Sequence, residues 1–298
     1  MKNPVIIGSR GSDLALWQAH FVQQQLLAIG VESTIEIIKT KGDAIQHLSF
    51  DKIEGKGFFT KEIEEALLAG SIDLAVHSHK DLETQSPEGL TVAAVSHRAD
   101  PRELLLIHPD AAVSNSPWQL KEQARVGTSS ARRKAQLLHA RPDAVPVDIR
   151  GNVPTRVNKL RNGQFDAILL AKAGVDRLQL DLSDLVVLPI EVNQLVPAPA
   201  QGVLAFQTRS TDTELIELLQ QINEPQIQKN IRIERTVLNR LQGGCQLPLG
   251  VHAQYHSNQF DVWVAYAPSW DGKLTQFHTT GTDESQLVDE ILQRIQSH

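Results

Sequence analysis

Short aliphatic runs alternate with segments of helical periodicity along the first two thirds of the chain. In the first hundred residues, the predicted strands are 5–8, 34–39, 74–77 and 90–95, and the predicted helices are 12–29 and 60–70. Beyond Arg102, a second set predicts strands at 104–107, 125–126, 145–149 and 167–170, with helices from about Ser130 and after Pro154. This alternation is typical of right-handed βαβ units in mostly parallel sheets, which bind ligands at the carboxyl ends of their strands.

The pattern changes after a proline-containing connector at 196–202. Two predicted helices, 211–222 and 227–241, lead into aromatic-containing runs between residues 251 and 280. Ser257-Asn258 and Asp271-Gly272 separate these runs and are typical hairpin turns. A last amphipathic helix carries apolar residues from 287 to 295. The C-terminal part is therefore predicted to be a small antiparallel α+β unit.

Composition narrows the class of protein. The 298 residues include one cysteine, so an internal disulfide is excluded, and no apolar run approaches the roughly 20 residues that cross a bilayer. We therefore expect a cytoplasmic protein that does not insert into membranes. The net charge is −6, yet the segment 125–161 holds nine basic and two acidic residues, a local charge of +7.

Four polar clusters stand where such a fold would place a binding site. Each follows a predicted strand or opens a predicted helix, and they span 8–12, 77–81, 127–133 and 150–156. Free backbone N–H groups and arginines at helix starts favour anions, so together the clusters predict a cleft for several carboxylates or phosphates. Any one cluster alone is also compatible with an ordinary capped turn. His77 and His79 lack partners at metal-ligand spacing, and no metal is predicted.

Two single residues are candidates for covalent and acid–base chemistry. Cys245 lies between two glycines and a Pro-Leu-Gly segment, which predicts a tight loop where a thiol near arginines becomes nucleophilic. A small buried hydrophobic role is the alternative for this cysteine. Asp81 follows a strand and is a general acid–base candidate, with a helix cap or an ion pair to Lys80 as its alternatives.

Taken together, the motifs resemble those of the porphobilinogen deaminase (hydroxymethylbilane synthase) family. The matching segments follow the family's order over nearly the whole chain. They are 9–18, 55–59, 76–82, 127–133, 150–156, 166–178, 197–202 and 243–250.

The resemblance implies an α/β fold of two domains like those of type II periplasmic binding proteins, with a small C-terminal α+β domain that has a three-stranded antiparallel sheet. It places domain 1 at 1–98 with a return segment at 199–218, and domain 2 at 99–198. Domain 3 covers 219–298 and carries the cysteine.

The resemblance also implies an activity, a transferase of tetrapyrrole and haem biosynthesis. Four porphobilinogen molecules condense head to tail with loss of ammonia on a dipyrromethane cofactor, held by a thioether to Cys245, and hydrolysis releases hydroxymethylbilane. Asp81 matches the catalytic aspartate, and Lys56 lies in a lid loop. The expected cofactor and substrate ligands are Arg10, Ser12, Gln18, Lys56, Ser78, Lys80, Thr128, Ser129, Ser130, Arg132, Arg133, Arg150, Gly151, Arg156, Arg177 and Gln201.

The expected partners are porphobilinogen and the growing polypyrrole, with neither nucleic acid nor membrane, and the expected state is a monomer. Four positions depart from the family pattern: His79 for Met, Glu83 for Pro, Ala200 for Gly and Gln207 for Glu. Ala200 is expected to stiffen the connector, because alanine lacks the φ freedom of glycine. A non-catalytic anion-binding module of solute-binding-protein type remains the alternative, and nucleic-acid binding through the +7 segment is a third hypothesis.

Overall fold

The computed structural model describes residues 4–40, 60–242 and 246–297. The chain divides into two compact units. Unit 1 comprises Met1–Ala99 with Gly202–Lys229, and unit 2 comprises Asp100–Gln201 with Asn230–His298. Within the described ranges, no helix is both long and apolar enough to cross a membrane.

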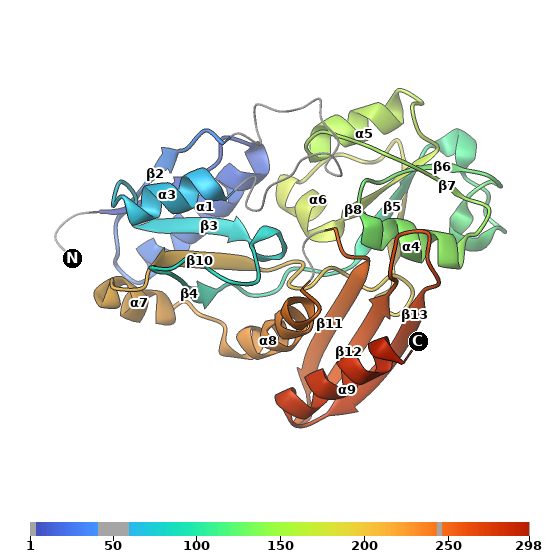
Figure 1. Ribbon diagram of the computed structural model, residues 1–298. Helices are drawn as coiled ribbons and strands as arrows, with labels where there is room; N and C mark the ends of the chain where they lie inside the picture. The colour runs from blue at the N-terminus through green and yellow to red at the C-terminus, as the bar shows by residue number, and fades with distance from the viewer. Residues whose placement is uncertain (1–3, 41–59, 243–245, 298) are drawn as a thin grey trace. The chain divides into compact units, whose positions relative to one another are not determined.

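Unit 1 is built on one five-stranded sheet in the order β2-β1-β3-β10-β4 (Figure 1). Its strands are β1 (Val5–Ser9), β2 (Ser33–Ile37), β3 (Leu74–Ser78), β4 (Leu90–Val95) and β10 (Leu204–Arg209). Its helices are α1 (Asp13–Ala28), α3 (Lys61–Leu68) and α7 (Thr213–Gln220), with a 3₁₀ turn η2 at His79–Asp81. Apolar residues of α1 and α7 pack in one core cluster with the sheet, and those of α3 pack in another. Alternate strand residues face the two clusters, so the sheet is covered on both sides.

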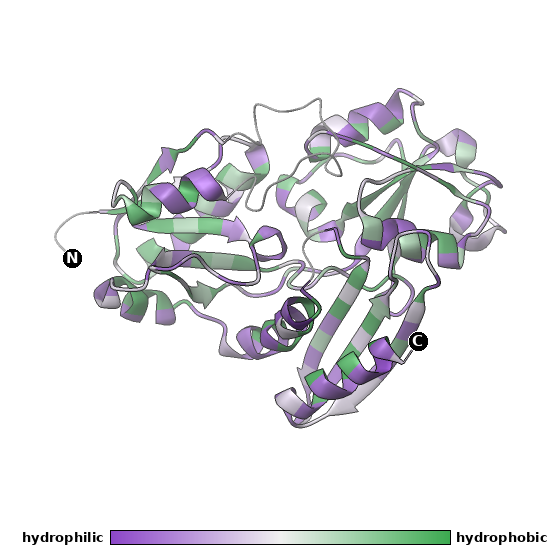
Figure 2. Ribbon diagram, viewed as in Figure 1, coloured by the Kyte–Doolittle hydropathy of each residue, from purple (hydrophilic) through white to green (hydrophobic). Residues whose placement is uncertain are grey.

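Unit 2 contains a second five-stranded sheet with the corresponding order, β7-β6-β8-β5-β9. Its strands are β5 (Glu103–Ile107), β6 (Arg125–Gly127), β7 (Val145–Val147), β8 (Ala167–Ala171) and β9 (Val186–Ile190). The associated helices are α4 (Ala131–Ala140), α5 (Val153–Arg161) and α6 (Lys172–Leu178), and two 3₁₀ turns are η3 (Pro109–Ala111) and η4 (Pro117–Gln119). The central strands are mainly hydrophobic, as expected for strands buried on both faces (Figure 2).

One strand in each of these sheets runs against the others. β10 is antiparallel to β3 and β4, and β5 is antiparallel to β8 and β9. Each is the first strand after the chain passes from one unit to the other, at residues 201–202 and 99–100. This shared topology confirms the predicted pair of α/β folds of the type II periplasmic-binding-protein kind. The sequence patterns did not predict β9, β10 or α6.

A three-stranded antiparallel sheet, β11-β12-β13, forms the rest of unit 2 and confirms the predicted α+β part. The strands are β11 (Leu249–His256), β12 (Gln259–Tyr266) and β13 (Thr275–Gly281). They are accompanied by helix α9 (Glu284–Gln296) and by helix α8 (Pro225–Arg240), which begins in unit 1 and belongs to unit 2 from Asn230 onward. Ser257 and Asn258 both have positive φ, 51° and 64°, as a tight hairpin between twisted strands requires. Apolar residues of α8 and α9 share one core cluster with this sheet.

The edge strand β11 is tied to the connector that precedes the crossing. The Val251 N–H donates to the Pro197 carbonyl at 3.1 Å. A Cβ at Gly250 would lie 2.6 Å from the Val196 oxygen, so only glycine permits this approach. The buried Glu234 carboxylate accepts from the Ala253 N–H at 2.8 Å and from the Ala200 N–H at 2.6 Å. These bonds fix the start of β11, four residues after Cys245, to the connector.

Ala200 itself is fully buried in a left-handed conformation, with φ of 62°. A left-handed alanine costs about 1–2 kcal/mol, whereas the extra chain entropy of glycine costs about 0.5–1 kcal/mol. We therefore expect Ala200→Gly to raise the free energy of unfolding by about 0.5–1 kcal/mol, measured as a higher Tm.

Gly202→Ala is the matched control for this substitution. Gly202 has a φ of 88°, and an added Cβ would lie 2.5 Å from the Ala99 oxygen, so this variant should lose stability. A lower Tm for Ala200→Gly would contradict the strain assigned to Ala200.

Candidate functional site

The first two predicted clusters meet in unit 1 at the carboxyl ends of β1 and β3. Ser12 caps α1 by accepting from the Ala15 N–H at 3.4 Å, and Arg10 lies partly exposed on the preceding turn. The buried Gln18 side chain donates through Nε2 to the Ser78 hydroxyl at 2.9 Å. This bond joins the helix that follows β1 to the end of β3, where the second cluster begins.

Asp81 lies on the 3₁₀ turn that follows β3 and is exposed to solvent. The His79 N–H donates to the Val203 carbonyl at 2.9 Å, and the Leu82 N–H donates to the His79 carbonyl at 3.3 Å. His79 and Leu82 are buried, whereas Lys80 is partly exposed. The turn is thus anchored on both sides of Asp81, which leaves its carboxylate accessible at the edge where α/β sheets bind ligands.

A buried polar chain lies directly before this turn. His77 Nε2 is 3.2 Å from Gln207 Oε1, and Gln207 Nε2 donates to Glu64 Oε1 at 2.9 Å. Burial lowers the pKa of His77 to about 4, against a smaller opposing effect of the Gln207 bond, and burial raises the pKa of Glu64. His77 is therefore neutral at physiological pH. The side-chain amide of Gln207 hydrogen-bonds to this neutral histidine through its oxygen and to the Glu64 carboxyl group through its nitrogen.

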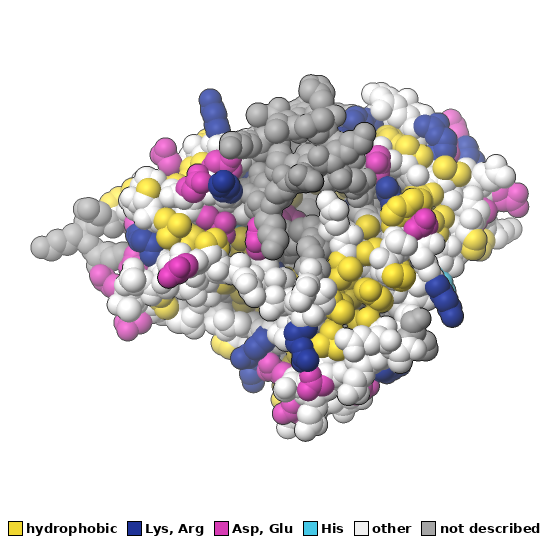
Figure 3. Space-filling model, viewed as in Figure 1, with side chains coloured by type: hydrophobic (Ala, Val, Ile, Leu, Met, Phe, Trp, Pro, Cys, Tyr) yellow, Lys and Arg dark blue, Asp and Glu magenta, His cyan; other side chains and the backbone are white. Residues whose placement is uncertain are grey.

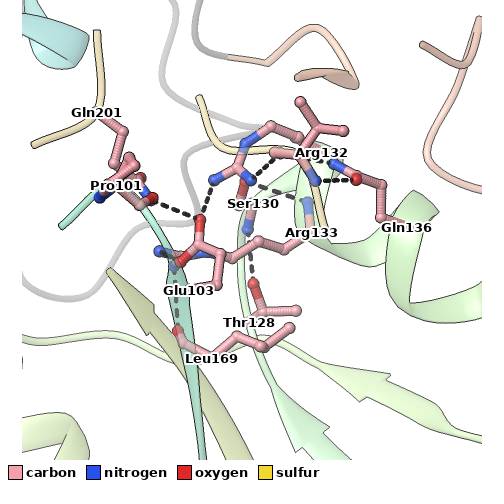
Figure 4. Close-up of polar contacts among 10 residues, drawn as sticks. Pro101, Glu103, Thr128, Ser130, Arg132, Arg133, Gln136, Leu169 and Gln201 are labelled. Carbon is pink, nitrogen blue, oxygen red and sulfur yellow. Dashed lines mark hydrogen bonds and ion pairs between the residues drawn. The ribbon is translucent and has the colours of Figure 1, made fainter. Parts of the chain in front are cut away.

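The clearest charged assembly in unit 2 surrounds Glu103, the first residue of β5 (Figure 4). Its fully buried carboxylate accepts from Arg132 Nη2 at 2.6 Å and from Arg133 Nη2 at 2.7 Å, one guanidinium on each oxygen. Gln201 Nε2 adds a bond of 3.0 Å to Glu103 Oε1 and donates to the Pro101 carbonyl at 2.8 Å. Burial lowers the pKa of Arg132, and arginine remains protonated in proteins.

The Nη1 group of each guanidinium binds a backbone carbonyl. Arg132 Nη1 donates to the Val196 carbonyl at 2.9 Å and Arg133 Nη1 to the Leu169 carbonyl at 3.1 Å. Gln136 binds Val196 twice, donating to its carbonyl at 3.0 Å and accepting from its N–H at 2.6 Å. Arg133 Nε is buried and finds no hydrogen-bond acceptor among the described residues.

The hydroxyl residues of the third cluster shape the loop between β6 and α4. Ser130 caps α4 by accepting from the Arg133 N–H, and the buried Thr128 hydroxyl accepts from the Ser130 N–H at 3.3 Å. Ser129 exchanges two bonds with the Ile149 backbone, at 2.8 and 3.0 Å. Ser129 therefore joins the third cluster to the fourth, because Ile149 directly precedes Arg150.

The fourth cluster opens α5. Arg156 Nε donates to the Gly151 carbonyl at 2.7 Å, and the Arg150 carbonyl accepts from Lys159 at 3.0 Å. Arg150 and Arg156 are themselves partly exposed. Arg177, on α6, is partly exposed as well, and burial lowers its pKa to about 10 against the opposing charge of Asp176. All three guanidiniums are thus partly exposed to solvent, and arginine side chains stay protonated in proteins.

Several other cations of the +7 segment are engaged in structural pairs. Arg141 is buried among three backbone carbonyls and Asp143, Lys134 pairs with Asp148 at 2.8 Å, and Arg161 pairs with Asp184 at 2.7 Å. On the face drawn in Figure 3, Lys and Arg side chains are scattered among acidic ones. Such pairing weakens the hypothesis of a nucleic-acid surface, which needs a basic patch.

Two predicted residues, Cys245 and Lys56, lie outside the described residues, as does the predicted lid loop at 55–57. In the part of the chain that the structure describes, no group of His, Cys, Asp or Glu side chains forms a metal site. Glu103, Gln136 and Glu234 were not predicted as site residues. No sequence signal marked Glu103, which stands between Arg102 and the aliphatic run Leu104–Ile107; the structure shows that every residue of this strand is buried.

The two mixed sheets, with arginine and hydroxyl side chains near their strand ends, define a periplasmic-binding-protein-like α/β protein extended by an antiparallel domain. Two family models match it: "Porphobilinogen deaminase, dipyromethane cofactor binding domain" over residues 5–217, and "Porphobilinogen deaminase, C-terminal domain" over 229–286. The chain belongs to the porphobilinogen deaminase family.

Individual relatives cover almost the whole chain. A porphobilinogen deaminase of a Nitratiruptor species is 44% identical over 306 residues, covering 98% of this chain and 96% of the relative. Another from Chloroherpeton thalassium is 40% identical, covering 97% and 92%. A solved periplasmic substrate-binding protein of an ABC transporter from Coxiella burnetii shares 15% identity with a TM-score of 0.46, covering 74% of this chain and 92% of that protein.

The neutral state of His77 predicts a specific pH dependence of stability. Its folded-state pKa of about 4 lies below the ordinary 6.5, so the unfolded chain binds this proton more readily between these values. The free energy of unfolding that depends on neutral His77 is therefore fully present above pH 6.5. It is lost as the pH falls toward 4, by up to about 1.4 kcal/mol per pH unit.

We therefore expect His77→Asn to lose less Tm than the unsubstituted protein between about pH 7 and pH 4.5. His20→Asn is the control, since His20 is exposed in the same unit, and it should keep the original pH dependence. Equal pH dependence in His77→Asn and the unsubstituted protein would show that His77 is not held neutral.

Proposed function

We propose that the chain is a hydroxymethylbilane synthase, a transferase that joins four porphobilinogen molecules head to tail with release of ammonia. Hydrolysis then frees the linear product for tetrapyrrole and haem biosynthesis. The observation that carries this proposal is the match to both family models, in order, over residues 5–217 and 229–286. The non-catalytic binding-module alternative is not favoured, because relatives named for the deaminase cover nearly all of the chain.

The charged residues of unit 2 fit a group that carries several carboxylates. Arg132, Arg133 and Glu103 together hold a net charge of +1 in a buried setting, and the buried Arg133 Nε lacks an acceptor among the described residues. Buried charge and an unsatisfied donor both favour an incoming anion. Arg150, Arg156 and Arg177 are accessible for further carboxylates.

The family's dipyrromethane cofactor is such a polycarboxylate. We place its attachment at Cys245 through a thioether, since this is the chain's one cysteine and it precedes the anchored strand β11. When bound, the cofactor supplies the free pyrrole end that accepts the first porphobilinogen. The arginines and the hydroxyls of Thr128 and Ser130 would hold its acidic side chains, and bidentate pairing with arginine would fix its register.

Asp81 carries the chemical step in this proposal. Its accessible carboxylate accepts a hydrogen bond from the pyrrole N–H of porphobilinogen. As the aminomethyl group leaves as ammonia, positive charge develops on that pyrrole, and the fixed negative charge stabilises it. Lys80, Ser78, Gln18, Arg10 and Ser12 then bind substrate carboxylates around the turn, with Lys56 reaching the site from its loop.

We propose the domain boundaries expected from the resemblance: 1–98 with 199–218, 99–198, and 219–298. The separate core of each sheet supports this division. We further propose that the protein acts in the cytoplasm as a monomer on porphobilinogen and the growing polypyrrole, without nucleic acid or membrane partners.

A covalent cofactor predicts a specific mass. The protein purified from a porphobilinogen-replete host should exceed its sequence mass by two porphobilinogen units less two ammonia molecules, because each thioether or methylene link expels one ammonia. Cys245→Ser should show the sequence mass alone, as measured by intact-mass spectrometry. An unmodified wild-type protein would contradict both the cofactor and the attachment residue.

The role of Asp81 predicts a loss of turnover without a loss of fold. Asp81→Ala should keep its Tm within a few degrees, because the side chain is exposed, and should lose about 10²–10⁴-fold in kcat. Glu83→Gln is the matched control, a carboxylate two residues along the same segment, and should stay within twofold of wild type. Near-normal bilane formation by Asp81→Ala would refute the assignment.

A further inference from the structure

One carboxylate serves two guanidiniums in unit 2. Glu103 Oε1 binds Arg132 and Glu103 Oε2 binds Arg133, at 2.6 and 2.7 Å. All three side chains are buried, with exposed fractions of 0% for Glu103, 6% for Arg132 and 8% for Arg133. Short bonds between buried ions depend strongly on geometry, so the position of Glu103 sets the position of both guanidiniums.

The bonds on Glu103 and on the backbone leave the arginine pair little freedom. Each guanidinium has one Nη on Glu103 and the other on a backbone carbonyl, Val196 for Arg132 and Leu169 for Arg133. The two guanidiniums are therefore presented at a fixed spacing rather than as flexible surface charges. A rigid pair can discriminate one placement of a ligand carboxylate from another.

The charges of these three side chains do not cancel. Glu103 neutralises one of the two positive charges, so the three side chains together carry +1 rather than +2. The buried Arg133 Nε has no acceptor among the described residues, which leaves a hydrogen-bond donor open in the same assembly. Such an assembly matches one additional carboxylate in charge, and a second would find no remaining net charge there.

Glu103 also links this pair to the segments where the chain enters and leaves unit 2. Gln201 Nε2 binds both Glu103 Oε1 and the Pro101 carbonyl. Pro101 and Gln201 lie within two residues of the two crossings at 99–100 and 201–202. The arginine pair is thus anchored to the ends of both connecting segments through a single carboxylate (Figure 4).

We infer that Glu103 is a positioning residue of the binding site, which holds Arg132 and Arg133 as a rigid pair with one net positive charge, a receptor for a single carboxylate of the bound pyrrole chain. Glu103 does not touch the ligand and acts through the two arginines. This inference rests on the proposed function, because the ligand carboxylate belongs to the cofactor or to the pyrroles added to it.

The test is a thermodynamic cycle on the full-length protein. The four proteins are wild type, Glu103→Gln, Cys245→Ser and the double variant, each checked by intact mass and measured for Tm. Gln at position 103 keeps the shape but removes the charge and presents an N–H₂ group to one guanidinium. Loading with cofactor should raise the Tm of the wild type above that of Cys245→Ser, and this increment should fall at least about twofold in the Glu103→Gln background.

Asp143→Asn is the matched control, because it removes the carboxylate of a different arginine–carboxylate ion pair in unit 2. In that pair, Arg141 Nη2 lies 2.7 Å from Asp143 Oδ2. It should lower the Tm of the loaded and unloaded proteins equally. Folded, loaded Glu103→Gln should also lose at least about tenfold in kcat/KM, and Glu103→Asp, which keeps the charge with a shorter reach, should recover part of both effects. A Glu103→Gln protein that folds but carries no mass increment would also support the inference, because it would have lost the cofactor altogether.

Equal cofactor increments in Tm with Glu103→Gln and with Asp143→Asn would overturn the positioning role. If Glu103→Gln fails to fold, the cycle is run with Glu103→Asp. In that case, a Tm increment on cofactor loading that equals the wild-type increment overturns the positioning role of Glu103. A wild-type protein that carries no mass increment would instead overturn the proposed function, so the two failures are distinguishable.

Discussion

The buried carboxylate of Glu103 between two arginines is the interaction on which the proposed binding site of unit 2 depends. Two adjacent guanidiniums repel each other, and burying both without a counter-ion would cost several kcal/mol. Glu103 removes this conflict and lets Arg132 and Arg133 project from the first turn of α4 into the interior. The bonds to Val196 and Leu169 then extend the assembly into the connector and into β8.

The two α/β folds share a strand order but differ in the charged groups at their strand ends. In unit 1, the buried His77 before the turn is neutral, and the exposed carboxylate of Asp81 follows it, with the cations of Arg10 and Lys80 partly exposed at the same strand ends. In unit 2, the strand ends carry the arginines. In the proposed reaction, positive charge develops on a substrate rich in carboxylates, so the reaction needs both a fixed negative charge and cationic ligands. An α/β fold can present either kind of group at its strand ends.

Local signals predicted much of this architecture. Ser12 and Ser130 were identified at helix starts and cap α1 and α4, and the Ser257-Asn258 hairpin forms as expected. The strand β10 was missed because its interior position and antiparallel direction are set by pairing with β3 and β4, far away in sequence. Glu103 was missed for a related reason: its partners Arg132 and Arg133 lie 29 and 30 residues away, and a lone glutamate before an aliphatic run shows no sign of burial. Both arginines were predicted as ligand residues, but the ion pairs that they form with Glu103 were not predicted.

The most direct test of the account is a crystal structure of the cofactor-loaded protein at a resolution that separates carboxylate oxygens. The account predicts that one pyrrole carboxylate lies within hydrogen-bond distance of the Arg132 and Arg133 pair while Glu103 keeps its bonds to both, with the other carboxylates on Arg150, Arg156 and Arg177. A loaded structure in which Arg132 and Arg133 contact only protein groups, or in which Glu103 has released them, would contradict it.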